Sequence, residues 1–199
     1  MSNATEEDDL MLAENLVFKP RNLTLRKIPR NHSLTPDFLI LKGANPVAFC
    51  EVKSPRDDWL DVLLEKANLC AIVGGARKDP TFNRIVRLST KAAKQFEAVN
   101  KNRVLPNILC FINHDDASHY GDLVETYTGI FHATNGGRYM TMQHTASLLD
   151  KAKTQIDICI WINANAKKIE GYLFNQNASP DYEADLCNLL GQSASKISN

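Results

Sequence analysis

Two apolar runs separated by a short break constrain the fold of this chain more than any other feature. They are Phe38–Leu41 and Val47–Cys50, and Lys-Gly-Ala-Asn-Pro stands between them. Alternating apolar residues on both sides of a break that contains Gly, Asn and Pro predict two strands joined by a turn. The stretch Thr35–Pro55 is therefore expected to form a β-hairpin, and the rest of the chain has to pack around it.

Charged residues stand at the ends of these two expected strands. Asp37 opens the first strand, and Glu51 and Lys53 close the second with Val52 between them. Successive side chains of a strand point to opposite faces, so Glu51 and Lys53 share one face while Val52 turns into the core. Adjacent strands would bring Asp37 beside that pair. Two carboxylates and an ammonium group would then meet at the edge of an apolar sheet.

A bound divalent metal is one explanation for this meeting of charges. The carboxylates of Asp37 and Glu51, together with the Val52 carbonyl, offer the oxygen ligands that suit Mg²⁺ or Mn²⁺. Such an ion polarises a phosphodiester and lowers the pKa of a bound water, and Lys53 would orient that water or stabilise developing charge. The alternative is an exposed hairpin in which Asp37 caps a turn and Glu51 and Lys53 form a solvated pair.

Pro36-Asp37, a spacer and Glu51-Val52-Lys53 resemble the PD-(D/E)XK signature of the restriction-endonuclease-like nuclease superfamily. The resemblance implies that Asp37 and Glu51 are metal-binding acids and that Lys53 is the catalytic lysine of a metal-dependent nuclease. It also implies a further acid from the helix before the first strand, for which Glu14 is the candidate. A solvent-facing helix glutamate is the alternative for Glu14. The expected substrate is DNA, with RNA left open.

Periodicity along the first half of the chain predicts the order helix, strand, strand, strand, helix, strand. The expected elements are a helix opened by Thr5 and ended by Pro20, a strand over 22–28, the hairpin, a helix through Trp59–Leu69, a helix over 81–101 and a strand over 107–113. This αβββαβ order is that of the superfamily core. We therefore expect one α/β domain over 1–199, with a core at about 6–113 and a mixed central sheet flanked by helices.

Residues 114–190 are expected to form a C-terminal α/β elaboration, followed by a disordered tail over 191–199. The segment 123–131 fits a helix or a strand, Asn135-Gly136-Gly137 marks a turn, Leu148 and Leu149 fit a short helix, 156–162 and 169–174 fit paired strands, and a last helix starts at Asp181. At the start of this half, His114, Asp115, Asp116 and His119 form an alternative metal cluster, although their spacing matches no ligand template.

Basic residues lie on either side of the expected site. Arg26, Lys27 and Arg30 precede the hairpin, where they would meet phosphates or form a solvated edge. Lys91 and Gln95 are four positions apart on one helix face, with Lys94 beside them. The resemblance implies a polar residue from this helix at the active site, a role that fits Gln95 with Lys91. Basic residues that simply face water are the alternative.

Composition narrows the range of functions. The 23 basic and 23 acidic residues cancel, which argues against a broad basic surface but leaves room for a local patch. Five scattered cysteines with apolar neighbours favour core thiols in a reducing compartment, and no apolar run reaches membrane-spanning length. We expect a cytoplasmic endonuclease of restriction, repair or mobile-element biology, with no membrane partner and with a homodimer as the form that cuts both strands. The alternative is a nuclease fold without catalysis, serving as a nucleic-acid-binding or protein-interaction module.

Overall fold

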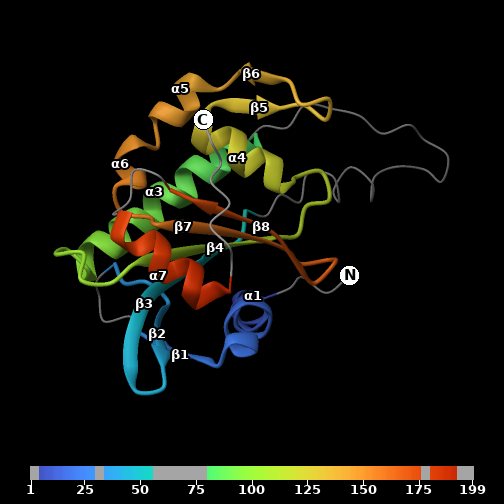
Figure 1. Cartoon of the computed structure of the whole chain (residues 1–199). Helices are drawn as coiled ribbons and strands as arrows, with labels where there is room; N and C mark the ends of the chain where they lie inside the picture. The colour runs from blue at the N-terminus through green and yellow to red at the C-terminus, as the bar shows by residue number, and fades with distance from the viewer. Residues whose placement is uncertain (1–4, 30–33, 56–79, 176–179, 192–199) are drawn as a thin grey trace.

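The computed structural model describes residues 5–29, 34–55, 80–175 and 180–191 (Figure 1). Its centre is a six-stranded sheet in the order β1-β2-β3-β4-β7-β8. The strands are β1 Leu23–Lys27, β2 Phe38–Lys42, β3 Asn45–Lys53, β4 Asn107–Asn113, β7 Ile158–Asn163 and β8 Lys168–Phe174. Strands β3, β4 and β7 run parallel, whereas β1–β2, β2–β3 and β7–β8 pair antiparallel. The sheet is mixed, as the sequence predicted.

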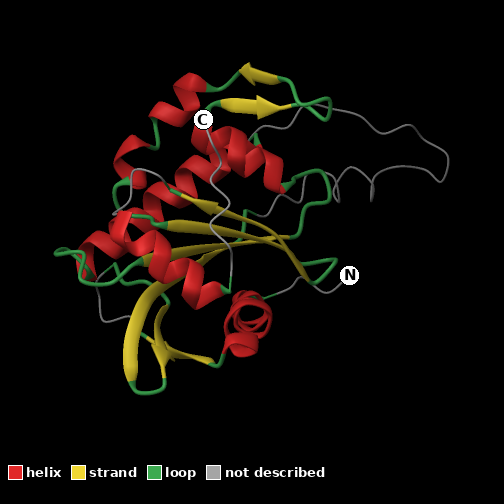
Figure 2. Ribbon diagram, in the orientation of Figure 1, coloured by secondary structure: helices red, strands yellow, loops and turns green. Residues whose placement is uncertain are grey.

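Helices cover both faces of this sheet (Figure 2). One face carries α1 Glu6–Ala13, its π-helical continuation Glu14–Phe18, a 3₁₀ turn Lys19–Arg21 and α7 Pro180–Leu190. The other carries α3 Thr81–Val99, α4 Tyr120–Thr128 and α6 Asp150–Lys153, and α5 Gln143–Ser147 packs against α3 and α4. The protein is therefore an α/β protein in which helices flank a mixed six-stranded sheet, and the predicted class is confirmed at that level.

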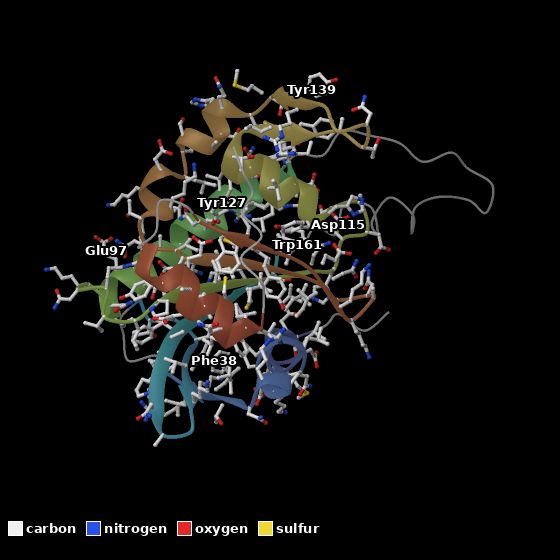
Figure 3. The ribbon with its side chains drawn as sticks, in the orientation of Figure 1. Phe38, Glu97, Asp115, Tyr127, Tyr139 and Trp161 are labelled. Carbon is white, nitrogen blue, oxygen red and sulfur yellow. The ribbon has the colours of Figure 1, made fainter. Side chains whose placement is uncertain are left out.

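Two apolar cores lie between the sheet and the helices, one on each face. Ile40 and Ile160 belong to the core under α1 and α7, whereas Phe96, Phe111 and Trp161 belong to the core under α3 and α4. Figure 3 shows Trp161 inside the molecule and Tyr139 at its outer edge. Every residue of β4 is buried. The continuous apolar run NILCFIN follows from this position, because a parallel strand covered on both faces has no solvent-facing side.

The predicted hairpin forms from β2 and β3. Phe38 pairs with Cys50 and Lys42 with Asn45, with a register shift between Ile40 and Leu41. Gly43 in the turn has φ +63°, a left-handed conformation that glycine adopts without steric cost. The turn chemistry read from the sequence is thus the chemistry that joins the strands.

The N-terminal segment begins and ends as its residues dictate. Thr5 Oγ1 accepts a hydrogen bond from the Asp8 N–H, and the Asp8 side chain accepts one from the Thr5 N–H, which makes a capping box at the start of α1. Arg21, the last residue of the 3₁₀ turn, fixes this segment to the C-terminal part of the chain. Its guanidinium donates to the Leu190 carbonyl at 2.7 Å and to the Tyr172 hydroxyl at 3.0 Å.

The C-terminal half resolves the segments that the sequence left open. Residues 123–131 divide between α4 and the strand β5 Ile130–His132, which pairs with β6 Arg138–Met140 across the predicted Asn135-Gly136-Gly137 turn. This hairpin forms its own two-stranded sheet. Leu148 and Leu149, expected within one short helix, lie instead in the turn between two short helices, α5 and α6. The pairing of β7 with β8 confirms the last strand pair.

Several predictions concern residues that the structure does not describe. The helix through Trp59–Leu69, the tail over 192–199, Arg30 and Cys70 lie outside the described residues. Cys50, Cys110, Cys159 and Cys187 are buried free thiols, in agreement with the expectation of core cysteines. Within the described ranges, no helix combines the length and the apolar character needed to cross a membrane.

Candidate active site

The hairpin brings Asp37, Glu51 and Lys53 together at one end of the sheet. The Asp37 N–H donates to Glu51 Oε2 at 2.9 Å, and the Val52 N–H donates to Asp37 Oδ2 at 2.9 Å. Lys53 Nζ forms an ion pair with Glu51 Oε1. Each acid is thus held by a backbone N–H of the neighbouring strand, so the antiparallel register itself fixes the positions of both carboxylates.

Burial makes the charge on this cluster costly. Asp37 is 4% exposed and Glu51 is fully buried. Removal from water and, to a smaller extent, the negative charge of Asp37 together raise the pKa of Glu51 from 4.5 to about 7, against the opposing effects of Lys53 and Gln95. Two adjacent buried carboxylates with one ammonium group leave a net negative charge, and a cation bound beside them would stabilise it.

Glu51 and Lys53 open onto a cleft of about 480 Å³, which Asp37 itself does not line. The strand β3 contributes Glu51, Val52 and Lys53, and the loop before β2 contributes Thr35. Lys91 and Gln95 line the opposite wall from α3, as their four-residue spacing predicted. The lining is completed by Glu6, Asp9, Leu10, Leu34, Ser54 and Leu88.

Gln95 is tied into this wall by its side-chain amide. Its Nε2 donates to the Thr35 carbonyl at 2.7 Å, and the amide also interacts with Glu51, where it lowers the pKa of that carboxyl. Of the other residues predicted to meet nucleic acid, the three that the structure describes do not line the cleft. Lys94 is exposed on α3, and Arg26 and Lys27 are exposed on the edge strand β1.

Glu14 does not line the cleft. It lies in the π-helical turn, partly exposed, with its carboxylate 3.7 Å from Lys19 Nζ. The start of the helix faces the cleft instead, because α1 packs against β3 and β4 at this end of the sheet. Glu6 and Asp9 are therefore the acids that α1 presents to the cleft.

Sequence reasoning did not select Glu6 and Asp9 as site residues. Their i, i+3 spacing places them on one face of α1, and this was the available signal. Asp9 is 5% exposed, and its Oδ1 lies 2.6 Å from His114 Nε2. Contact with the loop after β4 was not visible in the local sequence.

The alternative metal cluster does not assemble. His114 pairs with Asp9, and Asp116 accepts a hydrogen bond from Asn165. Asp115, seen in Figure 3, accepts from the Ala117 N–H and from Ser118 Oγ and lies 3.5 Å from Arg84. His119 caps α4. Across the described ranges no three His, Cys, Asp or Glu side chains group so as to hold a metal ion.

Comparison with known proteins gives no relative. No protein-family model matches the chain, and neither the curated proteins nor the solved structures contain a match. The fold and the cleft therefore define this molecule as an α/β protein with a buried acidic cluster at one end of its sheet.

Proposed function

We propose that the protein is a metal-dependent nuclease that hydrolyses phosphodiester bonds of DNA. The observation that carries this proposal is the buried Asp37–Glu51–Lys53 cluster, in which backbone hydrogen bonds hold both acids while Glu51 and Lys53 line a cleft. Support for a restriction-endonuclease-like core comes from the element order α1, β1, β2, β3, α3, β4 with β4 parallel to β3. RNA remains open as a substrate.

The donor set fits a small divalent cation. Mg²⁺ needs only one or two carboxylates, because water and substrate phosphate complete its coordination. Asp37, Glu51 and the Val52 carbonyl would hold Mg²⁺ or Mn²⁺, and the net charge of the buried cluster favours a cation. When bound, the ion would activate the phosphodiester and a water molecule for hydrolysis.

Lys53 and the wall formed by α3 would act on the substrate itself. The Lys53 ammonium pairs with Glu51, and in the proposed reaction it would stabilise the negative charge that develops during phosphodiester cleavage. Lys91 adds a second positive charge to the cleft, suited to a neighbouring phosphate. Arg26, Lys27, Arg30 and Lys94 remain proposals for phosphate contacts beyond the cleft. Cutting of both strands would call for a homodimer.

Cleavage of supercoiled plasmid in Mg²⁺, Mn²⁺ or EDTA tests the proposal. We expect metal-dependent nicking or linearisation by the parent, and its loss in Lys53→Ala because the ammonium at the reacting centre is gone. Lys42→Ala, an exposed lysine at the other end of the same hairpin, is the matched control and should cut like the parent. A Lys53→Ala protein that cuts at the parental rate contradicts the assignment.

A second test needs no turnover. Mg²⁺ or Mn²⁺ should raise the melting temperature of the parent, since ligands that bind only the native state stabilise it. Asp37→Asn keeps an oxygen that can accept from the Val52 N–H but removes a charge, so this metal-dependent rise should disappear. Glu183→Gln on the exposed face of α7 should retain it. An equal rise in all three proteins would show that the metal binds elsewhere.

The second candidate is a nuclease fold that binds nucleic acid without cutting it. The observation that favours it is the closed Lys53–Glu51 ion pair, which occupies Glu51 Oε1. Metal-dependent stabilisation together with DNA affinity but without cleavage under any condition would support this candidate over the enzyme.

A further inference from the structure

Two buried oxygens of residues that line the cleft have no hydrogen-bond partner among the described residues. They are Thr35 Oγ1 and Gln95 Oε1. Thr35 is 9% exposed and Gln95 is 6% exposed, and both line the cleft next to Glu51. Buried polar atoms are nearly always paired in native proteins, so two such atoms at one site require an explanation.

The packing determines which atom of the Gln95 amide is left without a hydrogen-bond partner. Nε2 donates to the Thr35 carbonyl at 2.7 Å. The amide also interacts with the Glu51 carboxylate, and because a carboxylate only accepts hydrogen bonds, its NH₂ group must make this interaction. Since a carbonyl oxygen cannot donate, rotating the amide by 180° would lose both interactions. Oε1 is therefore fixed as an acceptor, and the hydroxyl of Thr35, the residue that the same amide contacts, can both donate and accept.

A neutral acceptor and a hydroxyl select a particular kind of ligand. They offer no charge to a phosphate, whose oxygens need donors such as Lys53 or Lys91. They suit a small molecule that donates hydrogen bonds, and a water molecule meets this need when a polar site gives it two or more partners. Glu51 and the cluster held by the hairpin lie alongside.

We propose that Thr35 Oγ1 and Gln95 Oε1 bind and orient the hydrolytic water of the nuclease reaction. This inference rests on the proposed function and makes Thr35 a positioning residue for the attacking water. The water oxygen forms the new bond to phosphorus while the bond from phosphorus to the leaving sugar oxygen breaks. One proton of the water reaches the leaving oxygen through solvent, and the other stays with the new phosphate monoester.

The matched pair Thr35→Val and Thr35→Ser tests the pairing. Valine has the shape of threonine without the hydroxyl, whereas serine restores the hydroxyl. We expect Thr35→Val to lower kcat by roughly 100-fold, with KM and the Mg²⁺ activation constant close to the parent values, because only the nucleophile is misplaced. Thr35→Ser should recover most of this loss. Thr24→Val, at an exposed position on β1, should behave like the parent.

Other kinetic outcomes overturn the inference. A raised Mg²⁺ activation constant in Thr35→Val would make Thr35 a metal ligand, and a raised KM with unchanged kcat would make it a substrate contact. Loss of activity in Thr35→Ser as well would point to a structural role for the threonine methyl group.

Crystal structures of the parent and of Thr35→Val separate this inference from the proposed function. The parent should show one water within hydrogen-bond distance of both Thr35 Oγ1 and Gln95 Oε1, and the variant should lack it with Gln95 unmoved. A parent crystal without that water overturns the inference whether or not the protein cuts DNA. A parent that carries the water but cleaves no substrate with any metal overturns the proposed function and the hydrolytic role together.

Discussion

Two buried acid–base groups occupy opposite ends of the parallel strands, and only one of them adjoins the cleft described above. At the carboxyl end of β3, Glu51 pairs with Lys53. At the opposite end Asp157, which directly precedes β7, pairs with Arg103. Both acids are almost fully buried, at 0% and 3% exposure, and burial raises the pKa of both. An acid with a raised pKa and a basic partner is thus not in itself a sign of an active site.

The difference lies in what each carboxylate holds. The two oxygens of Asp157 accept from Arg103 and from the Asn107 N–H, the latter at 2.7 Å, and this joins β4 to β7. Tyr182 of α7 lies against the Arg103 guanidinium and donates to the Arg103 carbonyl. The Asp157 group therefore has a structural role, because it links β4, β7 and, through Arg103, α7. Glu51, by contrast, lines a cleft whose walls come from α1, α3 and the hairpin, and this convergence separates a candidate site from a structural ion pair.

The strongest test of this comparison is to remove Asp157 and measure the stability of the fold. Asp157→Ala leaves the Asn107 N–H without its acceptor and Arg103 without its counter-charge, so the free energy of unfolding should fall by about 3 kcal/mol. Asp185→Ala, an exposed aspartate on α7, should change it by less than about 0.5 kcal/mol. Chemical denaturation at pH 7 measures both. A small effect of Asp157→Ala would mean that this link contributes little and that the two groups differ less than their contacts suggest.

Glu51→Gln should have a smaller effect on the free energy of unfolding, and the effect should be a gain relative to the parent that grows with pH. In the native metal-free protein Glu51 has a pKa of about 7 against 4.5 when unperturbed, so the native state binds the proton more tightly than the unfolded chain. This contribution to stability is complete below pH 4.5 and is lost as the pH rises through 7. The variant lacks this titration. Its free energy of unfolding relative to that of the parent should therefore increase by on the order of 2 kcal/mol as the pH rises from 5 to 8.

Unfolding curves at several pH values in EDTA test this prediction, with the exposed Glu183→Gln as the control that should track the parent. A difference between Glu51→Gln and the parent that stays constant from pH 5 to 8 would contradict the raised pKa. It would also remove the electrostatic reason for a cation at this site.

Local sequence predicted the elements that carry their own signal. The hairpin followed from the alternation around its Gly-containing break, and β4 followed from an apolar run of strand length. The proximity of Asp37 to Glu51 followed from the same pattern, because an antiparallel register places the start of one strand beside the end of the next. Segment 123–131 stayed open because a short apolar stretch fits either period, and only packing on α3 decides it.

Contacts between distant residues could not be predicted in this way. Thr35 and Gln95 are 60 positions apart, and Arg103 and Asp157 are 54 apart. Nothing in either neighbourhood indicates the partner. Glu14 was expected at the site from the resemblance alone, whereas the packing of α1 against β3 and β4 brings Glu6 and Asp9 to the cleft. The orientation of a helix on a sheet depends on the whole core, which a single sequence does not reveal.

The smallest expected effect concerns DNA binding, and it compares a lysine of the cleft with a lysine near the Asp157 group. If the cleft receives a phosphate, Lys91→Ala should weaken DNA binding a few-fold and lower the slope of log affinity against log salt by about 1, since one fewer counterion is released. Lys101→Ala removes another exposed lysine, just beyond the C-terminal end of α3 on the side of the Asp157 group, and should leave the slope unchanged. Fluorescence anisotropy of labelled DNA in Ca²⁺, over a series of salt concentrations, measures both slopes. Equal slopes for the two variants would mean that Lys91 makes no phosphate contact and that the cleft is no better suited to DNA than the opposite end of the sheet.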